Sequence, residues 1–215
     1  LQERQPKYIK RQEIRTVIES ACPQMRAITL LGINCAFHNM DFALLENRHF
    51  DLTRCRVFFP RPKTGRCRFC VLWPITVTAI KELNEVRPEP QSDLFKERVL
   101  LTADGKPWVR GKNDDTSHLT KRFNELLESV GAKRKGISIS ALRSTFKTVA
   151  NQLGYKDVAK IVMGHDENVA DMDQFYVQQL DDSFDEFDSE SAEERKIRDC
   201  VSAVHKWLFG RDQTI

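Results

Sequence analysis

The chain has 215 residues, of which 40% are hydrophobic and 30% are charged. A chain of this length buries a sizeable core without disulfides or a structural metal, so we expect one large domain. No apolar run approaches the length of a membrane-spanning helix, which excludes such a span. The chain opens on Leu1 rather than Met and shows no secretory signal pattern, so we expect a cytoplasmic protein excised from a longer chain.

The net charge of +3 hides a strong asymmetry along the chain. Between Asp171 and Arg195 there are ten acidic residues and one arginine, a local net charge of −9, so the other 190 residues carry +12. A body this basic fits a polyanionic partner, since neutralisation of phosphates supplies most non-specific affinity for nucleic acid. A solvated basic surface on an ordinary enzyme is the alternative.

The first half of the chain predicts helices followed by a small hairpin. Residues 8–21 show helical spacing, and the apolar stretch 24–46 predicts one or two buried helices. Two β-rich runs, 57–59 and 68–73, lie on either side of prolines and a Lys-Thr-Gly turn, which predicts an antiparallel hairpin with Lys63 at its tip. A helix over 75–86 and a short strand with a glycine turn near residues 98–108 follow.

The second half is helical. We expect one helix over 116–130 and two helices within 138–165, the first with an apolar stripe. That stripe consists of Leu142, Phe146, Val149 and Leu153. The predicted organisation is a domain over 1–180, an acidic linker over 181–195, and a C-terminal helix and tail over 196–215. The C-terminal helix is expected to be amphipathic, with an apolar stripe of Ile197, Val201, Val204 and Leu208. The fold class is therefore α+β, a mostly α-helical single domain with a small antiparallel β-hairpin or sheet.

Several side chains have the chemistry that phosphodiester transfer requires, namely cations for the non-bridging oxygens, a nucleophile and a proton donor. Arg143 follows Leu142, the first residue of an apolar stripe, so its planar guanidinium leaves from the border of a buried face. Lys63 lies at the hairpin tip, with Arg61, Arg66 and Arg68 as candidate DNA-binding residues around it. His165 follows the helix-ending Gly164, and Tyr176 follows Phe175.

This ordered set resembles the catalytic domain of the tyrosine recombinases, the phage-integrase family, from about Tyr8 to Tyr176. The matching segments are "RPKTG", "SALRSTF", "VMGH" and "DQFY". The segment "LLGINCAFHNMDFALL" is most similar to divergent integrase-like recombinases of planctomycete bacteria. The resemblance implies a bacterial, nucleoid-associated protein that acts on double-stranded DNA as a dimer or tetramer, without metal or cofactor. The family's amino-terminal core-binding domain would precede Leu1.

By this resemblance, Tyr176 attacks a DNA phosphate to form a 3′-phosphotyrosyl bond while Arg143 binds the non-bridging oxygens. Lys63 protonates the departing 5′ oxygen, and His165 donates a hydrogen bond or assists proton transfer. The C-terminal helix docks either on a neighbouring protomer, as in the family, or on its own domain.

The sequence departs from the family pattern at two site positions. The arginine of the family's Gly-x-Arg-x-x-Glu box is replaced by His38, counted back from Asp41. The His of the family's His-x-x-Arg box is replaced by Ser140, which can bond phosphate but cannot act as a base at neutral pH. His38 as a cation, Arg48 or Arg26 are the candidates to replace the missing arginine.

Two other functions fit the same residues. A DNA-binding relative with a degenerate active site would keep the fold and the basic surface. A basic helical protein without a DNA role would show no salt-dependent binding to duplex DNA. Cys67 and Cys70 have the spacing of half a zinc site, but no second pair completes it, so we expect no metal.

Overall fold

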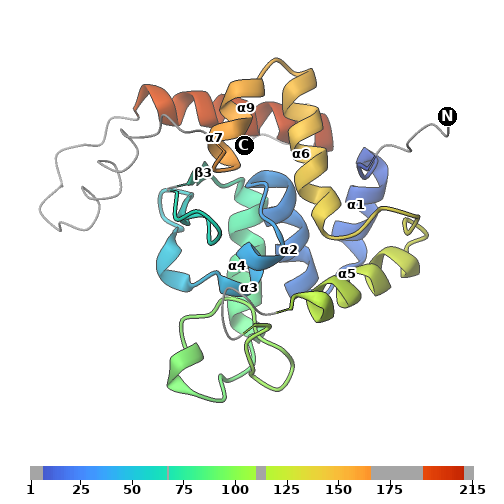
Figure 1. The fold of residues 1–215 in the computed structure, drawn as a ribbon, viewed down its shortest axis with the longest axis vertical. Coiled ribbons are helices and arrows are strands. Elements are labelled where there is room, and N and C mark those ends of the chain that lie inside the picture. The colour runs from blue at the N-terminus through green and yellow to red at the C-terminus, as the bar shows by residue number, and fades with distance from the viewer. Residues whose placement is uncertain (1–6, 67, 110–114, 166–190, 211–215) are drawn as a thin grey trace, which may run out of the picture.

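The computed structural model describes residues 7–66, 68–109, 115–165 and 191–210. Tyr176 and most of the predicted acidic linker lie outside these ranges. The described chain is mostly helical and carries one small antiparallel sheet, so the predicted fold class is confirmed (Figure 1). No helix in the described ranges is long and apolar enough to cross a bilayer.

Helix α2 (Pro23–Asn34) is the centre of the core. It contacts α1 (Arg11–Ser20), α4 (Pro74–Val86) and α6 (Ser140–Gln152), and these helices surround it in Figure 1. Both α2 and α4 begin with proline at the first helical position, where the missing N–H has no intrahelical partner to lose. Nearly every residue of α2 from Ala27 onward is buried, which explains why the sequence shows no amphipathic period there.

The buried side chain of Asn34 fixes the end of α2 to the sheet and to α4. Its Nδ2 donates to the carbonyl of Val71 at 3.0 Å, while its Oδ1 accepts from the Trp73 N–H at 2.8 Å and from the Thr76 hydroxyl at 3.0 Å. A fully buried amide that keeps its hydrogen bonds avoids a desolvation penalty, so this position is strongly specified.

The sheet has the order β1-β2-β3, with β1 (Phe50–Asp51), β2 (Arg56–Phe58) and β3 (Phe69–Val71). Val57 pairs with Phe50 on one side and with Cys70 on the other. The hairpin between β2 and β3 is the one predicted, whereas two-residue β1 was too short to show a period of its own. The short strand predicted near residues 98–108 is reduced to isolated bridges, Glu46 with Arg98 and Leu101 with Pro107.

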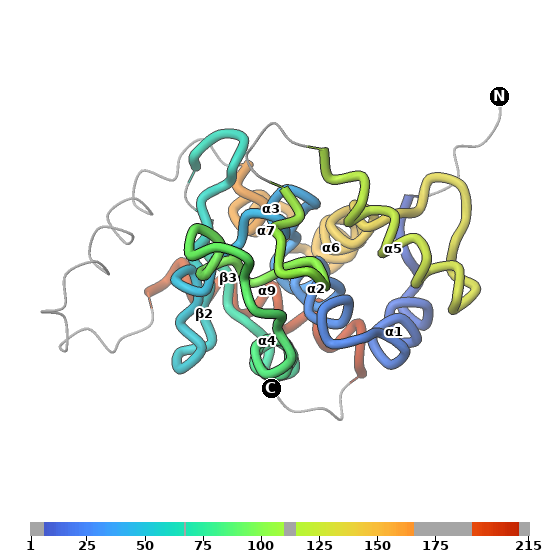
Figure 2. Tube along the Cα trace, turned by 90° about the horizontal axis from the view of Figure 1, so that it is seen from below, coloured from blue at the N-terminus to red at the C-terminus, as the bar shows by residue number. Residues whose placement is uncertain are grey.

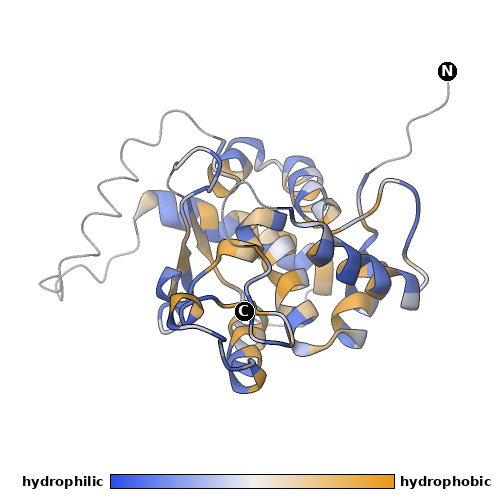
Figure 3. Ribbon diagram, turned by 60° about the horizontal axis from the view of Figure 1, so that its bottom comes forward, coloured by the Kyte–Doolittle hydropathy of each residue, from blue (hydrophilic) through white to orange (hydrophobic). Residues whose placement is uncertain are grey.

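The other helices of the described ranges pack around α2, the sheet and one another. They are α3 (Asn39–Leu44), α5 (Ser117–Ser129), α7 (Lys156–Val162) and α9 (Ala192–Phe209), with short 3₁₀ turns at Asn47–His49 and Asp93–Phe95. The residues that these helices bury are mainly hydrophobic, and Figure 3 shows hydrophobic and hydrophilic residues alternating along them. Leu153 is an exception to the predicted stripe of α6: it is 42% exposed because the helix ends at Gln152 and the chain turns away at Gly154.

Helix α9 begins at Ala192, within the predicted linker, and it packs against its own domain through contacts with α6, α7 and β3. The Trp73 indole N–H donates to the carbonyl of Val201 at 2.9 Å. A buried carboxylate on α9, that of Glu194, lies 2.8 Å from Nε of Arg56 on β2. The predicted stripe of Ile197, Val201, Val204 and Leu208 is fully buried.

Helices α2 and α6 approach each other closely at Gly32. A Cβ atom at this position would lie 2.9 Å from Cβ and 2.7 Å from Cδ1 of Leu142, the residue before Arg143. Only glycine allows this contact, so Gly32 sets the distance between α2 and the helix that carries Arg143.

We predict that Gly32→Ala lowers the free energy of unfolding by about 1–3 kcal/mol, because the added methyl group overpacks the contact with Leu142. Urea denaturation measures the change. Ser144→Ala, on the exposed face of α6, is the control and should change stability by less than about 0.5 kcal/mol. Equal stability of the two variants would contradict this packing argument.

Candidate active site

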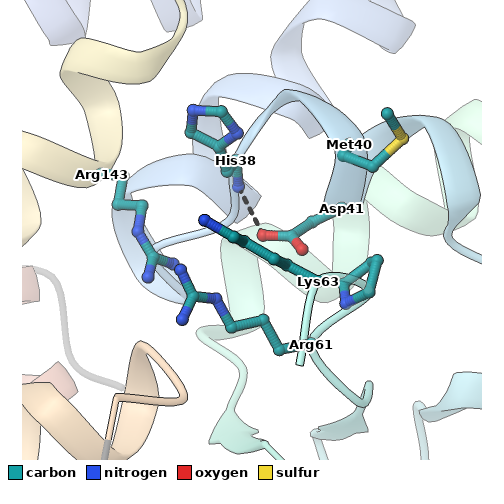
Figure 4. Close-up of a pocket in the computed structure, with 7 residues that line it drawn as sticks. His38, Met40, Asp41, Arg61, Lys63 and Arg143 are labelled. Carbon is teal, nitrogen blue, oxygen red and sulfur yellow. Dashed lines mark hydrogen bonds between the residues drawn. The ribbon is translucent and has the colours of Figure 1, made fainter. Parts of the chain in front are cut away.

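A hollow of about 520 Å³ opens where the hairpin, α3 and α6 meet. Its lining residues are His38, Met40, Asp41, Arg61, Pro62, Lys63 and Arg143 (Figure 4). In Figure 2 the loop between β2 and β3 lies beside α3 and α7, so segments far apart in the sequence converge at this place. Three of these side chains are lysine or arginine and one is a carboxylate, which makes the hollow a site for an anion.

Arg143 is 8% exposed and is held by three groups. Its Nη1 donates to the carbonyl of Ala36, and its Nη2 donates to the carbonyl of Met163 at 2.8 Å and lies 2.9 Å from Nε2 of His165. Burial, together with the positive charges of Arg68 and Arg61, lowers the pKa of Arg143 to about 10, so the group is still cationic at neutral pH. Its Nε–H and one Nη1–H are outside these bonds and can serve a ligand.

The carbonyl of Ala36 reaches Arg143 because the chain turns sharply after α2. Ala36 has a φ of 54°, in the left-handed region that glycine favours. This turn places His38 at the start of α3, on the wall of the hollow.

His165 is presented to solvent by the cap of α7. Gly164 has a φ of 63° and donates to the carbonyl of Ile161, while the His165 N–H donates to the carbonyl of Lys160 at 2.8 Å. This pair of bonds is a Schellman motif, in which glycine takes the left-handed position after the helix. The predicted junction of helix, glycine and histidine therefore directs the imidazole toward Arg143.

Partial burial, and then the positive charges of Arg143 and Arg61, lower the pKa of His165 to about 4. The imidazole is therefore neutral at neutral pH. Since arginine only donates, Nε2 of His165 accepts the bond from Arg143 and the ring proton lies on Nδ1. The arrangement favours a hydrogen-bonding role for His165 over a role as a protonated acid.

His38 is also a weak base in this environment. Partial burial of the ring and the charges of Arg143, Arg61 and Arg68 outweigh the nearby carboxylate of Asp41 and lower the pKa of His38. His38 is therefore neutral at neutral pH and does not replace the missing arginine as a cation.

The other two proposed replacements lie away from the hollow. Arg26 pairs with Glu82 at 3.1 Å, and Arg48 pairs with Glu46 at 2.7 Å with most of its side chain exposed. Neither lines the hollow. Lys63 does line it, carried by a turn in which the carbonyl of Arg61 accepts from the N–H groups of Thr64 and Gly65.

Arg68 is 1% exposed, which corrects its prediction as a DNA-binding residue. Its Nη1 lies 2.9 Å from Oδ2 of Asp41, its Nε donates to the carbonyl of Phe59, and its guanidinium lies over the rings of Phe37 and Phe59 at 4.6 and 5.3 Å. Asp41 Oδ2 also accepts from the His38 N–H at 2.7 Å. The sequence prediction missed this role of Asp41, although an acidic residue three positions after a helix N-cap is a capping signal.

Two further candidates lie next to the hollow rather than in its lining. Ser140 is the first residue of α6, one turn before Arg143, and its hydroxyl lies 3.1 Å from that of Ser138. Arg66 extends from the hairpin to the α7 cap, where its Nη1 donates to the carbonyl of His165 at 3.4 Å. Tyr176, the predicted nucleophile, lies outside the described residues.

No metal site is evident in the described part of the chain, where no three His, Cys, Asp or Glu side chains cluster suitably. Cys67 lies outside that part, and burial raises the pKa of Cys70 well above its usual value. A buried thiol that resists deprotonation is a poor metal ligand.

Solved structures similar to this chain are recombinases and integrases. XerA recombinase aligns with a TM-score of 0.63 at 18% identity, over 83% of this chain and 67% of that one. The integrase from mycobacterium phage Brujita aligns with a TM-score of 0.60 at 14% identity, over 100% of this chain and 62% of that one. The Tn1549 transposon integrase in complex with a circular intermediate DNA aligns with a TM-score of 0.62 at 15% identity, over 83% of this chain and 67% of that one.

The chain thus has the fold of tyrosine recombinase catalytic domains, and it spans roughly two thirds of the length of these neighbours. No family model and no curated protein sequence matches it.

We predict that Asp41→Asn lowers the free energy of unfolding by about 3–5 kcal/mol, because it leaves the Arg68 guanidinium buried without its counter-charge. Glu82→Gln is the matched control: it breaks the part-exposed pair with Arg26 and should cost about 1 kcal/mol or less. Urea denaturation measures both, and equal losses would contradict a structural role for the buried pair.

We also predict that His165 titrates near pH 4, as measured by NMR of its imidazole nitrogens. The unfolded chain takes up this proton near pH 6.5, so the group makes the fold less stable as pH falls from about 6.5 to 4 and has no such effect above that window. Arg143→Gln should raise the His165 pKa. A midpoint near 6.5 in the unaltered protein would refute the assignment.

Proposed function

We propose that this chain is the catalytic domain of a site-specific tyrosine recombinase that cleaves and rejoins DNA through a 3′-phosphotyrosyl intermediate. The observation that carries the proposal is the hollow in which Arg143, Arg61, Lys63 and His38 converge on a recombinase-type fold. Fold alone does not determine function, so the argument rests on this arrangement of groups.

The hollow suits a phosphodiester. Arg143 is fixed by carbonyls on two separate segments and keeps two N–H groups for non-bridging oxygens, so its orientation is set before DNA arrives. His165 Nε2 accepts from the same guanidinium, at the Nη2 that also donates to the carbonyl of Met163. Preorganised donors of this kind stabilise the charge that develops in the transition state without reorganising during the reaction.

Lys63 would supply the proton for the departing 5′ oxygen. It sits on a hairpin loop, and Figure 4 shows its side chain extending across the hollow toward His38 and Arg143. An ammonium on such a loop can follow the DNA backbone and still reach the reacting phosphate.

The nucleophile in this proposal is Tyr176. Attack of its hydroxyl oxygen on phosphorus forms the phosphotyrosyl bond and breaks the bond to the 5′ oxygen. The phenol proton is released to water, and the departing 5′ oxygen takes a proton from Lys63. The bond energy is kept, so a 5′ hydroxyl of another strand can reverse the step without an added energy source. Exchange between two duplexes requires a tyrosine at each, so the active form contains at least two copies on DNA.

A library of nicked duplexes with a randomised core tests the proposal, because covalent capture selects the target sequence from the pool. The unaltered protein should yield adducts that survive a denaturing gel, and Tyr176→Phe should yield none. Tyr155→Phe is the matched control and should keep adduct formation. Arg143→Lys should slow it by about a hundredfold, because an ammonium cannot reproduce the fixed fork.

Two results would overturn the proposal. Salt-dependent duplex binding without any adduct would support the alternative, a DNA-binding relative with a degenerate site. Absence of salt-dependent binding would indicate that the basic surface has no role with DNA.

A further inference from the structure

Arg61 is the second arginine at the reacting phosphate: we propose that its guanidinium, delivered by the hairpin, binds the non-bridging oxygens together with Arg143. This inference rests on the proposed function and adds a residue to it. His38 occupies the position of the arginine in the family's Gly-x-Arg-x-x-Glu box, and in this inference Arg61 takes over the phosphate-binding role of that arginine.

Position is the first argument. Arg61 and Arg143 both line the hollow, one from the hairpin and one from α6, and their guanidinium groups approach each other in Figure 4. The charge of Arg61 lowers the pKa of Arg143, of His38 and of His165, so it lies within electrostatic reach of all three. Neither Arg26 nor Arg48 lines this space.

The second argument is how the Arg61 side chain is supported. Its stem lies along Gly164, where a Cβ atom would be 3.4 Å from Cδ and 3.5 Å from Cβ of Arg61. Its Nη1 lies 3.5 Å from the carbonyl of Gly164, and no other hydrogen bond of its guanidinium is found among the described residues. The stem is therefore positioned while most of the donors are left for a ligand.

The third argument is the balance of charge. Arg61, Lys63 and Arg143 bring three positive charges to the lining, against the single carboxylate of Asp41. That carboxylate is already paired with the buried Arg68. Two guanidinium groups that repel each other across a hollow are stabilised by an anion that both can bind, and a phosphodiester with two non-bridging oxygens fits this requirement.

Single-turnover adduct formation on a captured nicked duplex tests the inference. Arg61→Gln, and Arg61→Lys, which keeps the stem packed on Gly164, should each slow the reaction by about a hundredfold. Arg48→Gln removes the same charge from an exposed site outside the hollow and should leave the rate unchanged. His38→Arg, made in the Arg61→Gln background, should restore most of the rate, because it returns a guanidinium to the same wall.

A second measurement does not depend on activity. Broadening of the ³¹P signal of inorganic phosphate reports binding in the hollow, and Arg61→Gln should weaken it about tenfold, whereas Arg48→Gln should not. If the unaltered protein forms no adduct, the proposed function fails and this measurement alone decides the role of Arg61.

Equal behaviour of Arg61→Gln and Arg48→Gln in the phosphate measurement would overturn the inference. A loss of rate in Arg61→Gln that His38→Arg does not restore, together with a normal rate in Arg61→Lys, would also overturn it, because it would assign Arg61 a structural role at the α7 cap.

Discussion

The buried ion pair between Arg68 and Asp41 is the interaction on which the site depends. Arg68 comes from the hairpin and Asp41 from α3, so the pair holds together two of the walls of the hollow. Burying both charges is costly, and the aromatic rings of Phe37 and Phe59, with the Phe59 carbonyl, supply part of the compensation. Hydrophobic residues could hold the same surfaces together at no greater cost. An ion pair adds direction, since Asp41 also accepts from the His38 N–H and so fixes the start of α3.

Two glycines, Gly32 and Gly164, determine how α6 and the end of α7 lie relative to this ion pair. Gly32 lets α2 and α6 approach until Leu142 touches the α2 backbone, which fixes where Arg143 leaves α6. Gly164 ends α7 in a left-handed turn, directs His165 to Arg143, and leaves room for the Arg61 stem. In both cases the absence of a side chain is what the geometry requires, so the active-site distances follow from backbone packing as much as from the charged residues themselves.

The parts predicted from the sequence are those that depend on local pattern. The hairpin with Lys63 at its tip, the glycine-capped helix before His165 and the buried stripe of α9 all follow from turn residues and apolar period. Arg68 is predicted at the surface because it lies among other basic residues, whereas its burial depends on Asp41 and on the ring of Phe37, both distant in sequence. Arg61 was expected only as a DNA contact. Its position in the hollow depends on contact with α7, which no local pattern encodes.

The cations that line the hollow, Arg61, Lys63 and Arg143, lie close enough to repel one another, so the site favours binding of an anion. Arg143 keeps its charge although burial and the nearby arginines lower its pKa to about 10, which means that the cations of the site repel one another. A fold tolerates such repulsion where function benefits, because native proteins sit above a stability threshold rather than at an optimum. In the proposed function, the oxygens of a bound phosphodiester offset this repulsion, and the increase of negative charge in the transition state offsets more of it. Under that proposal, repulsion among the site's own cations becomes selective binding of the reacting geometry, which is the requirement for catalysis.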